Sequence, residues 1–377
     1  MVKKREVTVM SKMNTLFLKT FNNSLGHIVK RDDIVWWKAW LIRIVSVVFA
    51  LVVCGFVTLS LTDLNPLEMY VTMVEGAVGT PRLTWNLLQN TAILLCVALA
   101  VTPAFKMKFW NIGGEGQILI GGLATATCMI FLGESLPKPL LILVMFVSSV
   151  VVAAIWGLIP AYFKTRFNSN ETLFTLMMNY VAIQLVAYFT LEWSVPRGSG
   201  TPRVLEFGQL PTLFGQKYLI NILIVAVLTI LIYFYLKYSK QGYEISVVGE
   251  SENTARYIGI NVKKVVLRTM AISGAICGIA GFLLVAGTDH SLKSDTSGGR
   301  GFTAIMVSWL AKFNPIFMVL TSLLIVFLQK GASKISEVYR LNSSFSDIIT
   351  GIIIFFIIGS EFFINYKIKF NKKEENV

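Results

Sequence analysis

Residues 111–117 read Asn-Ile-Gly-Gly-Glu-Gly-Gln and stand between two apolar runs of the chain. A carboxylate, two amides and three glycines are costly at such a place, because a bilayer core cannot satisfy loose backbone groups or an isolated charge. They are tolerated where they are buried in protein or line a polar cavity. We therefore interpret this segment as a break between helices and as a candidate functional segment.

The composition of the chain is that of a membrane protein with many spans. Of its 377 residues, 55% are hydrophobic and only 15% are charged, whereas a soluble domain is nearer to about 25% charged. The net charge is +13, but lysine and arginine fall in short segments between apolar runs. This pattern indicates membrane topology rather than a basic face that binds nucleic acid.

Apolar runs of two lengths occur along the sequence. Since about 20 helical residues cross a hydrocarbon core of about 30 Å, seven runs are long enough: 39–61, 84–105, 139–163, 172–192, 218–237, 267–288 and 346–366. Three runs are shorter, at 117–132, 301–312 and 315–331. Short runs interrupted by glycine or proline are typical of re-entrant helices that flank a pathway near the midplane. We predict an all-α polytopic membrane protein with about ten transmembrane or partly re-entrant helices.

The distribution of basic residues predicts the orientation of the chain. With ten segments and the N-terminus inside, 24 of the 34 lysines and arginines lie on the inner side. The positive-inside rule therefore favours cytoplasmic N- and C-termini. We predict a basic cytoplasmic tail at 1–38, a membrane domain at 39–366 with a cytoplasmic loop at 238–266, and a cytoplasmic tail at 367–377.

Catalytic and metal-binding motifs are absent from the sequence. The two histidines, His27 and His290, are far apart, and the four cysteines lie in apolar runs without metal-ligand spacing. No G-x-x-x-x-G-K-[ST] segment, hydrolase elbow or zincin motif occurs. We expect no catalytic residue, metal or cofactor, and we expect any energy source to lie on another chain.

Several polar residues in or beside apolar runs have two possible roles. Glu115 either caps the helix that follows it or contacts a solute together with Asn111 and Gln117. Asn170 is a helix cap by its position, whereas Asn179, about 13 Å deeper at helical rise, either lines a pore or contacts neighbouring helices.

The second short unit carries an arginine and a tryptophan. Arg300 either anchors the chain at the membrane interface or attracts an anionic group, and anchoring is the simpler interpretation. Trp309 either stacks on a ring-containing solute or packs in an apolar contact. The G-x-x-x-G spacing of Gly274 and Gly278, extended by Gly281, favours close helix packing within this chain over dimerisation.

The long loop near 238–266 contains a short helix signal. Ser251 can cap a helix that Gly259 ends, with Ala255 and Tyr257 on it. A short exposed helix suits docking into a groove of a soluble partner. The alternative is a solvated connector.

Five stretches occur in an order that is typical of one family. They are Asn-Ile-Gly-Gly-Glu-Gly-Gln at 111–117, Ser-Asn-Glu-Thr-Leu at 169–173 with Met-Met-Asn-Tyr after it, the loop sequence at 248–261, Ser-Gly-Ala-Ile-Cys-Gly-Ile-Ala-Gly-Phe at 273–282, and Gly-Gly-Arg-Gly-Phe-Thr-Ala-Ile at 298–305. From about residue 85 to 335 the chain resembles bacterial ABC importer permeases of the branched-chain amino acid/ribose-type family, in its nucleoside and simple-sugar branch. Ala311 departs from the glycine that is common before the Asn-Pro turn.

The resemblance implies roles for two sets of residues. The loop would be a coupling helix that contacts an ATPase, through Gly249, Glu250, Ala255, Arg256, Tyr257 and Gly259. The residues expected to line or shape a translocation pathway are Asn111, Glu115, Gln117, Asn179 and Trp309.

The resemblance also implies an assembly in the bacterial inner membrane. It comprises an ATP-binding subunit, a second paralogous permease as heterodimer partner, and an extracytoplasmic substrate-binding lipoprotein. The expected function is import of a nucleoside or a simple-sugar-like solute, with no bond of the solute broken and no nucleic acid involved. The alternative is an ion-coupled secondary transporter that acts alone, for which Glu115 and Glu361 are the few titratable candidates.

Overall fold

The computed structural model describes residues 27–31, 34–62 and 65–369. Most of the predicted N-terminal tail and the end of the C-terminal tail, residues 1–26 and 370–377, lie outside the described residues. The chain divides into two compact units, which are described separately. Unit 1 comprises Met1–Thr72 and Ile335–Val377, and unit 2 comprises Met73–Lys334.

Helices make up nearly all of the described chain, which confirms the all-α, multi-pass prediction. Nine helices among the described residues are long and apolar enough to cross a membrane. They are α2 (Trp36–Leu61), α4 (Pro81–Lys106), α5 (Gly114–Leu132), α6 (Lys138–Phe167), α7 (Glu171–Trp193), α8 (Leu219–Tyr238), α11 (Val262–Leu284) with the π-helix η1 (Val285–Asp289), α13 (Pro315–Val338) and α14 (Ser343–Asn365).

Two of the three runs predicted to be short are full-length helices. Helix α5 has 19 residues and α13 has 24, so only α12 (Arg300–Leu310), with 11 residues, is short. Helix α13 continues past the apolar run because the polar residues in its last turns can extend towards an interface. In α5, the glycines and Glu115 that interrupt the apolar pattern form its first turn.

Two shorter helices were not predicted from the sequence, α3 (Pro66–Val78) and α9 (Lys240–Glu250), whereas the short helix α10 (Glu252–Tyr257) lies where the loop sequence predicted one. The predicted cap of α10 is confirmed, since the Ser251 side chain accepts a hydrogen bond from the Thr254 amide. Gly259, just beyond the helix, has φ +85°. This left-handed conformation favours glycine and ends the helix as predicted.

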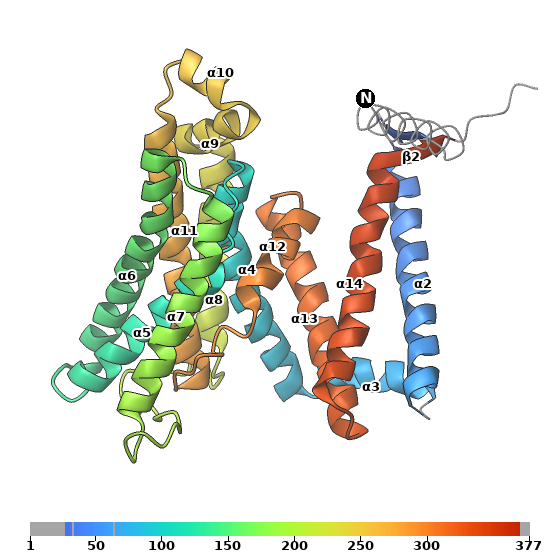
Figure 1. The fold of residues 1–377 in the computed structure, drawn as a ribbon. Coiled ribbons are helices and arrows are strands. Elements are labelled where there is room, and N and C mark those ends of the chain that lie inside the picture. Colours follow the sequence, from blue (N-terminus) through green and yellow to red (C-terminus); the bar gives the residue numbers. More distant parts are fainter. Residues whose placement is uncertain (1–26, 32–33, 63–64, 370–377) are drawn as a thin grey trace, which may run out of the picture. The chain divides into compact units, whose positions relative to one another are not determined.

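The core of unit 2 is formed by α4, α5 and α11, the most buried of its spans, with α6 against α5 and α11 (Figure 1). A Cβ on Gly274 would lie 2.4 Å from the Ala153 carbonyl, and one on Gly278 would lie 2.5 Å from the Ser149 carbonyl, both on α6. A Cβ on Gly281 would meet the Ile118 carbonyl of α5 at 2.3 Å. The small-residue stripe therefore serves close packing within the chain, as predicted.

Unit 1 joins the two ends of the described chain. Helices α2 and α14 lie side by side, and the strands β1 (His27–Lys30) and β2 (Tyr366–Lys369) pair antiparallel beside them (Figure 1). Arg43 and Glu361 form an ion pair at 2.6 Å between the two helices. The segments before α2 and after α14 therefore lie at the same end of this unit.

Candidate functional site

Glu115 links α5 by hydrogen bonds to the segment that begins α12. Its Oε1 accepts hydrogen bonds from the Ser297 hydroxyl at 2.5 Å and from the Gly299 amide at 2.8 Å. Its Oε2 accepts one from the Gly301 amide at 2.7 Å. Glu115 thus satisfies amides at the start of α12, where a negative charge also meets the positive end of the helix dipole. It caps α12 rather than its own helix, whose N-cap is Gly113.

Glycine makes this contact possible. A Cβ on Gly301 would lie 2.3 Å from the Glu115 amide nitrogen, closer than any real side chain approaches. Gly114 faces the same place, since a Cβ there would lie 3.6 Å from the Gly301 Cα. The glycines of the 111–117 segment and of the 297–305 segment therefore let two helix starts meet.

Asn111 and Asn179 tie the start of α5 to α7 and α11. The Asn111 amide group donates to the Ser273 hydroxyl at 3.1 Å, and its Oδ1 accepts from the Gly113 amide at 3.0 Å. Asn179 Oδ1 accepts from the Gly116 amide at 2.8 Å, and its Nδ2 donates to the Ile112 carbonyl at 2.9 Å. These bonds satisfy the backbone groups that the break in the chain frees.

The four polar residues predicted for a pathway lie together inside unit 2. Asn111, Glu115, Gln117 and Asn179 are all buried, with at most 6% of each residue exposed. The Gln117 Nε2 reaches Asn111 Oδ1 only at 3.5 Å, and its Oε1 has no partner among the described residues. In this conformation these side chains hold helices together.

Trp309, the fifth predicted pathway residue, belongs to an aromatic cluster at the far end of α12. It stacks on Trp110 with ring centroids 5.8 Å apart, and Phe105 and Phe313 contact it edge to face. Trp110 precedes the 111–117 segment directly, a signal the sequence offered but the prediction did not use. Both tryptophans remain about half exposed, at 46% and 49%. In this conformation Trp309 therefore packs against other aromatic side chains, which is the packing role considered from the sequence.

The 238–266 loop contains both packed residues and exposed residues. Helix α9 lies on the membrane helices, with Ile245, Val248 and Gly249 buried and an ion pair at 2.9 Å from Glu244 to Arg268 of α11. On α10, Ala255 is fully buried whereas Tyr257 is 92% exposed. Of the other predicted contact residues, Arg256 forms an exposed ion pair with Glu252, and Glu250 is exposed.

Gly249 connects this loop to the 111–117 segment. A Cβ on Gly249 would lie 2.1 Å from the Lys106 carbonyl, at the end of α4. Five residues after Lys106 the chain reaches Asn111. The base of the loop thus rests on the backbone that leads into the Glu115 contact.

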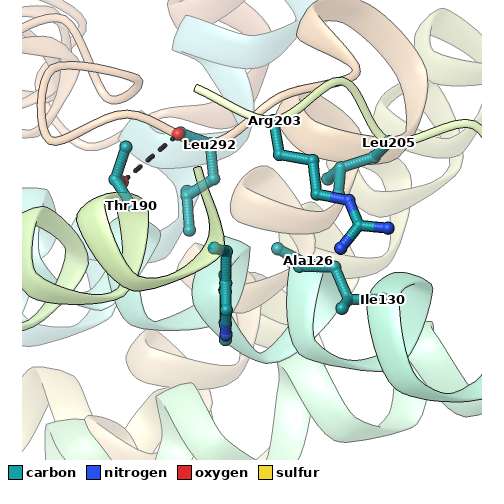
Figure 2. Close-up of a pocket in the computed structure, with 7 residues that line it drawn as sticks. Ala126, Ile130, Thr190, Arg203, Leu205 and Leu292 are labelled. Atoms are coloured by element: carbon teal, nitrogen blue, oxygen red, sulfur yellow. Dashed lines mark hydrogen bonds between the residues drawn. The ribbon is translucent and has the colours of Figure 1, made fainter. Parts of the chain in front are cut away.

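A small pocket lies elsewhere in unit 2, where the last turns of α5 and α7 meet connecting segments. Figure 2 shows its lining, which is mostly apolar: Ala126, Ile130, Thr190, Trp193, Arg203, Leu205 and Leu292. The Thr190 hydroxyl donates to the Leu292 carbonyl at 3.4 Å. None of the predicted site residues lines this pocket.

The fold and these contacts define a multi-pass α-helical membrane protein whose polar centre is a set of helix contacts rather than a catalytic group. The chain belongs to the family described as branched-chain amino acid transport system / permease component, whose model matches residues 83–358. It is thus a transport permease component and not an enzyme.

The chain is similar in sequence to curated relatives along nearly their whole length. A glucose ABC transporter permease protein of Haloferax volcanii is 28% identical over 88% of this chain and 90% of its own. A guanosine ABC transporter permease protein of Bacillus subtilis is 25% identical over 85% of this chain and 93% of its own. A nucleoside ABC transporter permease protein of Lactococcus lactis is 24% identical over 84% and 90%. The chain is therefore similar throughout to ABC transporter permeases for sugars and nucleosides.

Proposed function

We propose that this chain is a permease subunit of an ABC importer that moves a nucleoside or simple-sugar-like solute into the cell, driven by ATP hydrolysis on a partner subunit. The observation that carries this proposal is the 238–266 loop. It presents the exposed Tyr257 on a buried base, and that base rests on the Lys106 carbonyl through Gly249. A partner that docks on α10 can therefore displace the backbone segment that runs from Lys106 to Glu115.

In this proposal the displacement acts on the contact between Glu115 and the start of α12. Glu115 binds the start of α12 from the first turn of α5, so the two helices move together or the contact breaks. Rocking of such helices gives alternating access, in which differential binding energy shifts the population between outward and inward states. In this proposal Asn111, Gln117 and Asn179 shape the pathway by holding helices in place, and Trp309 lies at its inner end.

The partners follow from this function. We propose an ATP-binding subunit at α10, with Glu250, Arg256 and Gly259 beside Tyr257, a second paralogous permease, and an extracytoplasmic substrate-binding lipoprotein. Both termini would be cytoplasmic and the membrane would be a bacterial inner membrane, since 24 of 34 basic residues then face inward. Relatives named for glucose, guanosine and nucleosides support the solute class.

The contacts of the two titratable candidates disfavour an ion-coupled transporter that acts alone. Glu115 already accepts three hydrogen bonds from the protein, and Glu361 pairs with Arg43. A coupling carboxylate must be able to take up and release an ion during transport.

Purification of the tagged chain from its native membrane in mild detergent tests the proposal. A nucleotide-hydrolysing subunit should copurify in a stable ratio, and the complex should hydrolyse ATP. Isolation of the folded chain without any such subunit, from membranes in which it supports uptake, would contradict the proposal.

A further inference from the structure

A polar stripe on α4 lies outside every contact described above. Asn86 and Asn90 are four residues apart, so they lie on the same face of the helix. Both are partly exposed, and Asn90 Nδ2 donates to Asn86 Oδ1 at 2.9 Å. Leu88 lies between them in sequence, about 200° around the helix from Asn86 at 3.6 residues per turn.

Arg300 extends this stripe onto α12. Its Nη2 donates to Asn90 Oδ1 at 3.0 Å, and its Nη1 donates to the carbonyls of Thr296 and Ser297. Arg300 is therefore held against α4 rather than at a lipid headgroup, which differs from the anchoring interpretation. Its Nε has no hydrogen bond to any described residue.

Lys330 of α13 adds a second cation to the same region. It is partly exposed. Lys330 lies within reach of the charges of Arg300 and of the Asp289 carboxylate, so the region holds one acid beside its two cations. We call Asn86, Asn90, Arg300 and Lys330 the polar wall.

The depth of the polar wall decides what it faces. At a rise of about 1.5 Å per residue, Asn86 and Asn90 lie about 3 and 9 Å inside the apolar run that begins near residue 84. Partly exposed amide and charged groups at such depth cannot face hydrocarbon, because unsatisfied polar groups there are costly. They face water or another protein chain.

We propose that the polar wall lines a water-filled route along unit 2 and offers hydrogen-bond donors to a solute rich in hydroxyl and carbonyl oxygens. The side chains of Asn86, Arg300 and Lys330 supply such donors, whereas Asn111, Glu115 and Gln117 are buried. The solute class rests on the proposed function, but the presence of water does not.

Variants with one added cysteine test the route. The four native cysteines are buried and free, so their background reaction is low. Asn86→Cys and Asn90→Cys are compared with Leu88→Cys, which is 38% exposed in the wild type and lies between them in depth. Right-side-out vesicles are treated with membrane-impermeant anionic or cationic methanethiosulfonates, which need an ionised thiol in water.

The expected result is labelling of the Asn86→Cys and Asn90→Cys variants and no labelling of the Leu88→Cys variant. At Asn86→Cys the ratio of the anionic to the cationic rate should exceed the same ratio for a free thiol in solution, because Arg300 and Lys330 outnumber the Asp289 carboxylate and concentrate anions locally. Lys330→Gln should lower this ratio, whereas Lys138→Gln, at an exposed lysine elsewhere, should not. Thiol counts after denaturation correct for expression.

Equal labelling of all three cysteines, or none at Asn86→Cys and Asn90→Cys, would overturn the proposal. Absence of labelling at Asn86→Cys and Asn90→Cys means that another chain covers the polar wall. A ratio unchanged by Lys330→Gln would remove Lys330 from the wall. Failure of ATP-driven uptake, with labelling as expected, would contradict the proposed function and leave the water-filled route standing.

Discussion

The Gly301 amide donates to the Glu115 carboxylate at 2.7 Å, and a Cβ on Gly301 would lie 2.3 Å from the Glu115 amide nitrogen. The same two residues therefore combine a charge-assisted hydrogen bond with a backbone contact that only glycine permits. This pair joins the two segments that interrupt the apolar pattern in the two halves of the chain.

Gly301→Ala should separate α12 from α5. The added methyl group would collide with backbone that cannot move aside, so we expect a loss of about 1–3 kcal/mol of stability and reduced uptake. Thermal unfolding in detergent measures the first effect. Gly351→Ala, in α14 with no atom within 4 Å of the added Cβ, is the matched control and should not destabilise the protein. Equal effects of the two variants would contradict this account.

Glu115→Gln keeps the size of the side chain but turns one of its oxygens into an NH₂ group. That group must face either the Gly301 amide or the Ser297 and Gly299 donors, so at least one donor loses its acceptor. Hydrogen bonds to charged groups contribute about 1.5–3 kcal/mol, and we expect a loss in this range. Glu134→Gln, at an exposed acid beyond α5, should leave thermal stability and uptake unchanged.

Tyr257→Ala should abolish association with the ATPase and leave membrane insertion intact, because Tyr257 is 92% exposed and packs little within the chain. Copurification of the ATPase is the measurement. Tyr243→Ala removes a 62% exposed tyrosine of the neighbouring helix α9 and serves as control. If both variants retain the ATPase, α10 is not the docking element.

Gly249→Ala should act differently from Tyr257→Ala. The added Cβ would push α9 away from the Lys106 carbonyl while leaving Tyr257 exposed. We expect the ATPase to copurify and to hydrolyse ATP, with solute uptake lost. Hydrolysis and uptake measured on one preparation show the uncoupling, and uptake at the wild-type rate would exclude a role of this contact in transmission.

The sequence predicted those features that local chemistry decides. Ser251 and Gly259 mark the ends of α10 because a cap and a left-handed glycine act within a few residues. The stripe of Gly274, Gly278 and Gly281 predicted close packing for the same local reason. The position of Asn179 left two roles open. A position along a helix does not say whether a neighbouring helix or a pore lies beside the side chain.

Other features depend on contacts between distant parts of the chain. The partner of Glu115 is Ser297, 182 residues away, so no local pattern could assign the cap to α12 instead of α5. The length of α13 was underestimated because Gln329 and Lys330 end its apolar run while the helix continues. The polar wall was missed because Asn86 and Asn90 gain significance only beside Arg300.

The energy source of uptake tests the central claim most directly. Uptake of radiolabelled guanosine and of radiolabelled glucose is measured in cells that contain or lack this chain, once with ATP depleted while ion gradients are held, and once with the gradients collapsed while ATP is held. The account predicts that chain-dependent uptake stops in the first condition and persists in the second. Uptake that survives ATP depletion and stops when the gradients collapse would contradict it.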